Sequence, residues 1–414
     1  MESVMKKISS GARGLALLCM AVYFASYIMR NNIAVMTVRI CSDMEITKSS
    51  FAVVITGMTV CYGIGQLVSG FLGDRISARV MLGGGLLLAV ACNFAMFFAS
   101  EVPFMTVIWC VNGFAHALLW PPIVRLLSSN LNDAEYNYAV VRVSWGSSIA
   151  TIAMYLICPL LLTFMSWRVI ILVFASVGAI VAALWIMLNP RFVSNAKREE
   201  RSRVPTVQKK PLPRYLILPL AFIMLGIVLQ GVLRDGVTNW MPSLMNESFN
   251  LGEELSILST VILAVFGMLS YSVAAFLHTR FFKNEVTCAA VIFMFSAVVS
   301  LSLYFANEYI NSALLSAILL SLIVAGMHGI NLMLITIVPK RFAKSGKVST
   351  FSGILNACTY VGAAIATYGV AALAESYSWG VTILVWTGVA LLGAAACTLI
   401  LPLWGKFKKE YAEE

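Results

Sequence analysis

Two arginines placed inside apolar segments are the residues best suited to chemistry in this sequence. Arg30 follows YFASYIM in a run that is otherwise apolar from Gly14 to Val38, and Arg234 lies in the segment LQGVLRDGVTNW. A cation at the centre of a bilayer costs roughly 3 kcal/mol on insertion scales, so it is normally kept for a function. The two arginines are separated by nearly half of the 414 residues. This spacing predicts two halves that each contribute one cation to a shared site.

Helical spacing places further polar residues beside each arginine. Tyr23 and Tyr27 precede Arg30 on the same helical face, and Gln230 lies one turn before Arg234. Stripes of this kind on facing helices would form a cationic pocket in the membrane. Because the planar fork of a guanidinium bonds two oxygens at once, such a pocket suits a carboxylate or a phosphate. A small anionic substrate is the direct prediction.

Neutralisation within the protein is the alternative for each of these cations. Asp235 follows Arg234 directly and could pair with it, whereas no acidic residue lies near Arg30 in the sequence. Arg142 lies close to one end of its apolar segment, and we expect it to extend to the interface, with lining of the inner mouth as the alternative. His116 is expected to be a buried, neutral core residue.

Composition excludes an ordinary soluble domain and predicts an all-α integral membrane protein. Hydrophobic residues make up 60% of the chain and charged residues 12%, about half of the fraction that soluble domains carry. The apolar runs predict 12 transmembrane helices in two pseudo-symmetric six-helix bundles. The predicted parts are an N-terminal bundle (1–190), a basic linker (191–214) and a C-terminal bundle (215–414).

The distribution of charge predicts the topology. The net charge of +10 is concentrated in the linker and in alternate loops, which fits the positive-inside rule better than a nucleic-acid surface. We therefore expect a multi-pass protein of the bacterial cytoplasmic membrane with both termini in the cytoplasm. We expect no nucleic-acid partner. The nine cysteines lie mostly within apolar runs and show no CxxC motif. We expect no metal, no cofactor and no enzyme activity. We also expect a monomer whose partners are the small anionic substrate and membrane lipid.

The segment GFLGDRISAR resembles the loop signature of the major facilitator superfamily, G-x-x-x-D-R-x-G-x-R. Gly70 would allow close approach of two helices, and Asp74, Arg75 and Arg79 would form a gating charge network. Ser77 replaces the usual glycine. The resemblance implies the major facilitator fold, and a basic loop that only fixes topology is the alternative.

A narrower resemblance rests on YIMRNN, NGFAHALLWPPIVR, VLRDGVTNWMP and VPKRFAKSGKVSTFSGILNACTYVGAA taken together. These segments resemble the organophosphate:phosphate antiporter family, whose members exchange glycerol-3-phosphate or hexose phosphates. By this resemblance Arg30 and Arg234 would hold the phosphate. The other residues that it places in the pocket are Tyr23, Tyr27, Tyr62 and Tyr360. Trp120, from the family-like segment W-P-P-x-x-R, is a further candidate for substrate binding.

Several positions depart from the pattern of that family. Asn31 and Gln66 stand where the family has lysines, and Ser147 falls near the position of a histidine. His328 replaces a pocket tyrosine, and Asn239 replaces an acid. We keep Asn31, Gln66, Ser147 and His328 as candidate substrate-binding residues. The loss of cations leaves a carboxylate, a sulfonate or a zwitterion open as substrates beside a phosphate ester.

Three functions follow from these residues. The first is a secondary transporter that moves a small organic anion by alternating access, with the exchange of a phosphate ester for inorganic phosphate as its specific form. The second is a proton-coupled symporter on the same fold, with Asp235 or His328 carrying the proton. The third is an anion sensor that does not transport.

Overall fold

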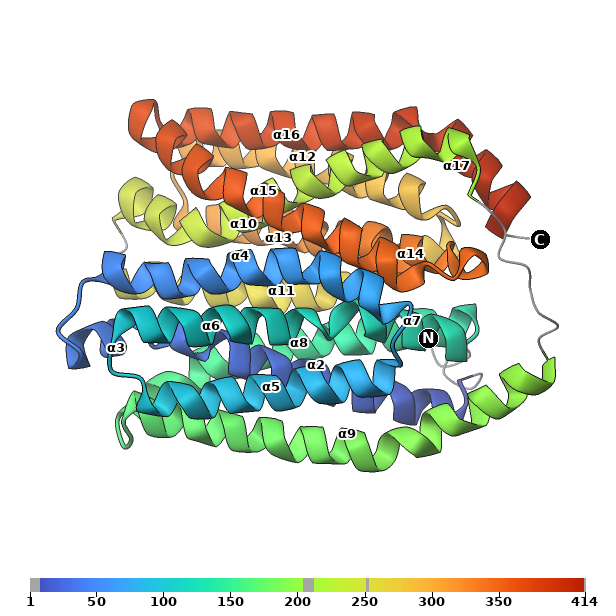
Figure 1. Ribbon diagram of the computed structural model, residues 1–414. Coiled ribbons are helices and arrows are strands. Elements are labelled where there is room, and N and C mark those ends of the chain that lie inside the picture. Colours follow the sequence, from blue (N-terminus) through green and yellow to red (C-terminus); the bar gives the residue numbers. More distant parts are fainter. Residues whose placement is uncertain (1–7, 204–211, 251–252, 413–414) are drawn as a thin grey trace. The chain divides into compact units, whose positions relative to one another are not determined.

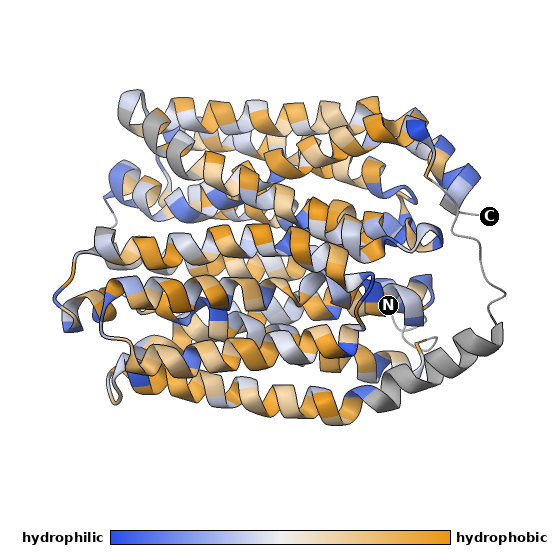
Figure 2. Ribbon diagram, in the orientation of Figure 1, coloured by the Kyte–Doolittle hydropathy of each residue, from blue (hydrophilic) through white to orange (hydrophobic). Residues whose placement is uncertain are grey.

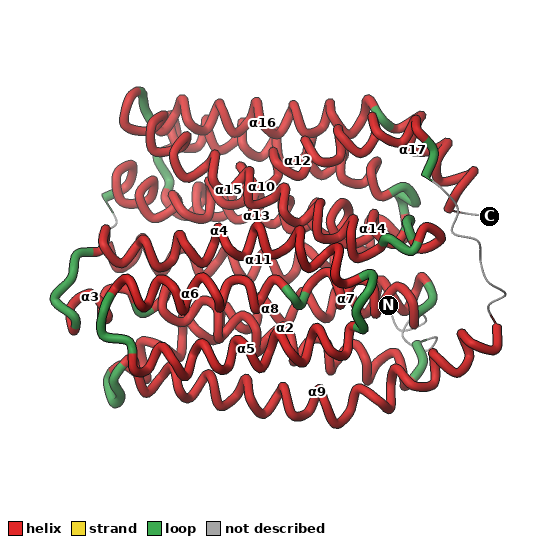
Figure 3. Tube along the Cα trace, viewed as in Figure 1, coloured by secondary structure: helices red, strands yellow, loops and turns green. Residues whose placement is uncertain are grey.

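The computed structural model describes residues 8–203, 212–250 and 253–412, and all the regular structure among them is helical (Figure 3). Twelve of these helices are long and apolar enough to cross a membrane, as the sequence predicts. Hydrophobic residues predominate along the helices and hydrophilic ones gather near their ends (Figure 2). The predicted all-α membrane fold with 12 spans is therefore confirmed.

The chain divides into two compact units (Figure 1). Unit 1 comprises Met1–Lys210 and Ser345–Ile354, and unit 2 comprises Pro211–Lys344 and Leu355–Glu414. The helices of unit 1 are α2 (Ser10–Val35), α3 (Thr37–Asp43), α4 (Lys48–Gly73), α5 (Ala78–Phe98), α6 (Val102–Ala117), α7 (Trp120–Asn130), α8 (Asp133–Leu162) and α9 (Trp167–Arg203). Helix α9 extends to Arg203, so the first half of the predicted linker is helical.

Unit 2 begins with a short 3-10 turn at Arg214–Leu216, and π-helical turns follow α12, α13 and α17. The α-helices assigned to it are α10 (Ile217–Phe249), α11 (Glu253–Arg280), α12 (Glu285–Phe305), α13 (Ala313–Ile330), α14 (Val338–Lys340), α15 (Val348–Ser376), α16 (Trp379–Leu399) and α17 (Leu401–Phe407). Helix α15 begins within the segment Ser345–Ile354 of unit 1 and continues in unit 2.

Local sequence explains where these helices start and stop. Ser, Thr and Asn side chains accept hydrogen bonds from the first turns of α2, α4, α5, α8, α12, α13 and α16. Helix α10 ends at Asn250 in the left-handed conformation, with φ of 52°. The fourth span is interrupted before Pro121 and Pro122, since α6 ends at Ala117 and α7 starts at Trp120 with these prolines in its first turn.

The same pairing of helices recurs in both units. In unit 1 the first span packs on the fifth (α2 and α8), the second on the fourth (α4 and α6) and the third on the sixth (α5 and α9). In unit 2, α11 packs on α13 and α12 on α16. Helix α10 meets α15 where Gly231 approaches the backbone of Thr359. This repetition fits the predicted pseudo-symmetry of two six-helix bundles.

Close contact between α2 and α8 depends on a glycine. A Cβ atom on Gly146 would lie only 2.6 Å from the backbone oxygen of Met20, so a larger residue would push these helices apart. The same register, an offset of 126 positions, holds at the start of both helices, where Glu135 accepts hydrogen bonds from the amide and hydroxyl of Ser9 at 3.2 and 2.6 Å. The two helices therefore run parallel with a fixed register.

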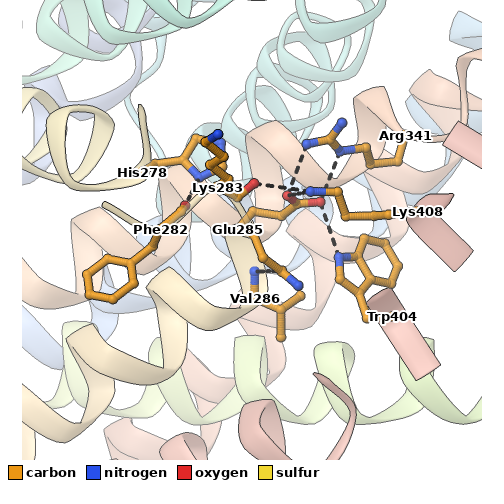
Figure 4. Close-up of polar contacts among 9 residues, drawn as sticks. His278, Phe282, Lys283, Glu285, Val286, Arg341, Trp404 and Lys408 are labelled. Carbon is orange, nitrogen blue, oxygen red and sulfur yellow. Dashed lines mark hydrogen bonds and ion pairs between the residues drawn. The ribbon is translucent and has the colours of Figure 1, made fainter. Parts of the chain in front are cut away.

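A charge cluster within unit 2 joins four segments around the buried Glu285 (Figure 4). Arg341 donates to both carboxylate oxygens at 3.0 and 3.1 Å, and the Trp404 indole donates at 3.2 Å. The Lys408 ammonium lies 3.5 Å from the same carboxylate and donates to the Lys283 carbonyl at 3.1 Å. The Glu285 carboxylate at the start of α12 thus joins Arg341, which follows α14, to Trp404 of α17 and to Lys408.

Candidate functional site

Arg30 lies on α2 against aromatic rings from two helices. Its guanidinium carbon lies 4.3 Å from the ring centroid of Tyr27 and 4.7 Å from that of Tyr62 on α4. The Tyr23 ring centroid lies 5.1 Å from that of Tyr27 and 5.0 Å from that of Trp120 on α7. Aromatic faces attract a cation through the negative charge of their π-systems. The structure thus brings together five of the predicted substrate residues, namely Arg30, Tyr23, Tyr27, Tyr62 and Trp120.

Buried asparagines hold the backbone on both sides of Arg30. The Asn93 amide on α5 donates to the Met29 carbonyl at 3.1 Å, and Asn112 on α6 donates to the same carbonyl at 3.3 Å. Asn32 donates to the Asn93 side chain at 2.8 Å. Since all three asparagines are buried, these bonds fix where α2 presents its arginine. Sequence reasoning missed Asn93 and Asn112, although an amide within an apolar segment was an available signal.

His116 of α6 is bonded to the same helix one turn before Arg30. Its Nδ1 lies 2.9 Å from the Ser26 hydroxyl, and its side chain is buried. Its other ring nitrogen, Nε2, is buried with no hydrogen-bond partner among the described residues. The bond to Ser26 agrees with the expectation of a core histidine held by a neighbouring helix.

Among the remaining predicted substrate residues of unit 1, Asn31 is bonded to Arg30. The Arg30 Nε is 3.4 Å from the Asn31 side-chain oxygen. Gln66 is one turn beyond Tyr62 on α4, and neither of its buried amide atoms has a hydrogen-bond partner within the described part of the chain. Ser147 donates to the Ser144 carbonyl at 2.7 Å. By the register of α2 and α8, Ser147 lies about two and a half turns below the level of Arg30.

Arg234 of α10 forms a two-pronged ion pair with its neighbour Asp235. The Nε–Oδ1 and Nη2–Oδ2 distances are 2.9 and 2.8 Å, and both side chains are about four-fifths buried. A fork-to-fork pair of this kind is the strongest geometry available to these groups. In the structure, Asp235 therefore pairs with Arg234, which is the alternative that the sequence left open.

Two polar bonds connect the surroundings of Arg234 to α13 and α11. Gln230, one turn before Arg234, donates to the Met327 carbonyl of α13 at 3.1 Å. The next residue, His328, bonds through Nδ1 to the Tyr271 hydroxyl of α11 at 3.0 Å. Tyr360, the predicted pocket residue of α15, is partly exposed. Tyr271 was missed because a tyrosine in an apolar segment gives no distinctive signal.

The predicted gating loop follows α4 and contacts the first turn of α15 within unit 1. The two Asp74 carboxylate oxygens accept from the Ser349 and Thr350 amides, each at 2.9 Å. A Cβ on Gly70 would lie 3.0–3.1 Å from the Ser349 oxygen and the Gly353 Cα, which explains the glycine. Asp74 is thus an anionic cap at a helix N-terminus, where the unpaired amides favour negative charge.

The basic residues of this loop have separate roles. Arg75 and Arg79 are exposed and make no ion pair with Asp74 among the described residues. Arg125, the last residue of the W-P-P-x-x-R segment, instead donates to the loop carbonyls of Gly73 and Ile76. The W-P-P-x-x-R segment therefore fixes the loop through its arginine and contacts Tyr23 through its tryptophan.

Comparisons with known proteins agree with this architecture. The sequence profile of the Major Facilitator Superfamily matches residues 19–367. The glycerol-3-phosphate transporter of Bacillus subtilis is 22% identical over 86% of this chain and 85% of its own length. A probable hexose phosphate transport protein of Chlamydia muridarum is 26% identical over 31% of this chain and 27% of its own. The membrane sensor protein UhpC of Salmonella typhimurium is 22% identical over 58% of each chain.

A solved structure shows the same fold. The proton:xylose symporter XylE superposes with a TM-score of 0.71 over 95% of this chain and 96% of its own, at 12% identity. The relatives are transport proteins and a membrane sensor rather than enzymes, as predicted. The profile covers most of the sequence, from residue 19 to residue 367. This chain therefore belongs to the major facilitator superfamily.

Proposed function

We propose that this protein is a secondary transporter that exchanges a small organic anion, a phosphate ester first among the candidates, for inorganic phosphate by alternating access. The observation that carries the proposal is the Arg30 guanidinium, held between the Tyr27 and Tyr62 rings inside an apolar span. A cation retained at such cost is explained by an anion that visits it. Arg234 is the second cation of the proposed machinery.

Relatives narrow the substrate class. The B. subtilis relative is named for glycerol-3-phosphate and the C. muridarum relative for hexose phosphate. Both ligands carry a phosphate that matches the two-pronged donor geometry of arginine. We further propose both termini on the cytoplasmic side of a bacterial membrane, a protein that functions as a monomer, and two bundles joined by the basic linker.

Counterflow tests the exchange directly. Proteoliposomes loaded with inorganic phosphate are placed in labelled glycerol-3-phosphate or glucose-6-phosphate, and uptake is followed with time. We expect uptake that depends on internal phosphate and is absent from protein-free vesicles. If phosphate-loaded vesicles take up no phosphorylated sugar or polyol, phosphate exchange is the wrong function. Binding of these anions without any flux would favour a sensor.

Proton-coupled symport is the second candidate, and the acid beside Arg234 motivates it. Both carboxylate oxygens of Asp235 are bonded to Arg234, so we take this acid as a structural partner of the arginine and not as the proton carrier. We therefore expect Asp235→Asn to leave the exchange rate within about fivefold of wild type, because the asparagine side-chain oxygen can still accept a hydrogen bond from Arg234. The measurement compares uptake with and without an imposed pH gradient. Gradient-driven uptake in wild type that disappears in Asp235→Asn would establish symport instead.

A further inference from the structure

The guanidinium of Arg142 on α8 lies between two aromatic rings of its own helix. Its central carbon is 4.2 Å from the Trp145 ring centroid and 5.0 Å from that of Tyr138. All three side chains are partly exposed. The group thus repeats the environment of Arg30, a cation placed over aromatic faces in a transmembrane helix.

No acidic residue neutralises this arginine within the described part of the chain. The acid two turns before it, Glu135, accepts hydrogen bonds from Ser9 and from the amide of Asn132. Among the described residues, Arg142 has neither a hydrogen-bond acceptor nor a carboxylate partner. Two other partly buried arginines of unit 1, Arg168 and Arg125, do have acceptors. Arg168 donates to the carbonyls of Phe97 and Ala99, and Arg125 to loop carbonyls.

The indole of Trp145 adds a second polar group at this place. Its N–H is buried and has no hydrogen-bond partner among the described residues. An unsatisfied buried donor costs roughly 1–3 kcal/mol, so a ligand acceptor that reaches it would be favoured. Guanidinium and indole N–H groups are both donors, and neither accepts a hydrogen bond. The donors of Arg142 and Trp145 therefore favour an anionic ligand.

The register of α2 and α8 fixes the depth of this place relative to Arg30. With the offset of 126 positions, Arg142 lies at the level of Ala16, 14 residues below Arg30. At 1.5 Å per residue this is about 21 Å toward the end of the bundle where α2 begins. The separation is too large for one small anion to contact both arginines at once.

We propose that Arg142, with Tyr138 and Trp145, forms a second anion-binding station that the substrate contacts before or after it occupies the site of Arg30. This proposal rests on the proposed anion transport. It adds a binding step to the transport path on the side of the membrane where α2 begins. Arg142 contributes the charge, Trp145 contributes an N–H donor, and the two rings hold the guanidinium in place. The ligand class is a phosphate monoester or inorganic phosphate.

The test uses full-length protein in proteoliposomes of known orientation. Exchange of labelled glycerol-3-phosphate for phosphate is measured separately from each side for wild type, Arg142→Gln and Arg39→Gln. Arg39 is a suitable control because it is an exposed cation in an i,i+4 pair with Asp43 at 3.0 Å. We expect Arg142→Gln to raise the KM measured from the side where α2 begins about tenfold, because one charge-assisted contact to the substrate is lost. The kcat and the KM measured from the other side should not change.

Equal changes on the two sides, or no change in KM, would overturn the station while leaving the transport function established by the wild type. A wild type without flux would instead overturn the proposed function. Charge rescue gives an independent result if Arg142→Gln does not fold. In Arg142→Cys, a cationic thiol reagent should lower the KM on that side and a neutral reagent of similar size should not. Equal effects of the two reagents would show that the charge is irrelevant.

Discussion

Replacing Arg30 with glutamine is expected to lower anion transport by at least about a hundredfold. A bound phosphate or carboxylate would lose two charge-assisted hydrogen bonds, each worth about 1.5–3 kcal/mol. The fold should survive, because the contacts of Arg30 to the Tyr27 and Tyr62 rings contribute only about 0.5–2 kcal/mol. The measurement is counterflow in proteoliposomes, with detergent-solubilised protein checked for its thermal unfolding midpoint.

Two further variants make this result specific. Arg30→Lys keeps the charge but loses the planar fork, so its transport rate should lie between the rates of Arg30→Gln and wild type. Arg39→Gln removes an exposed cation that is paired with Asp43 and should transport normally. Phosphate-dependent thermal stabilisation should disappear in Arg30→Gln and persist in Arg39→Gln. Transport by Arg30→Gln within a few-fold of wild type would show that this cation does not bind the substrate.

Replacing Glu285 with alanine is expected to give the largest loss of stability. The carboxylate is fully buried and balances Arg341 and Lys408, whose side chains are only 21% and 10% exposed. Removing one partner of a buried ion pair leaves uncompensated charge and costs about 3–5 kcal/mol. The Trp404 indole also loses its acceptor. The thermal unfolding midpoint of the purified protein should fall by several degrees.

The matched control lies in the same C-terminal segment. Lys406 and Glu410 form an exposed pair at 3.9 Å, so Lys406→Ala should leave the midpoint unchanged. Combining Glu285→Leu with Arg341→Met and Lys408→Leu should recover much of the loss, since apolar groups of similar volume often replace a buried charge cluster at no net cost. A midpoint for Glu285→Ala equal to that of Lys406→Ala would show that the cluster does not stabilise the fold.

The 12 spans could be predicted because hydrophobic length alone decides whether a segment crosses a bilayer. The break before Trp120 was also predictable, since two consecutive prolines remove backbone donors whatever surrounds them. The aromatic surroundings of Arg30 followed in part from the i, i+4 spacing of Tyr23 and Tyr27. These features depend on local geometry that the sequence contains.

Contacts between distant segments escaped prediction. The sequence presents Arg341 as one of several basic loop residues and Glu285 as a lone acid, and only tertiary packing joins them. Asp74 was expected to meet the arginines of its own loop, yet its oxygens reach the amides of Ser349 and Thr350, 275 and 276 positions away. Helix-end amides carry no residue-type signal, so no sequence pattern marks them as partners.

By itself, the sequence determined that this protein is a multi-pass membrane protein with two costly cations, because the burial of apolar length and the cost of buried charge are properties of residue type. The tertiary structure decided what surrounds each cation. It gave Arg30 and Arg142 aromatic faces and gave Arg234 an acid. Whether a charge is neutralised depends on distances of a few ångströms between side chains, and those distances are set only when the helices pack.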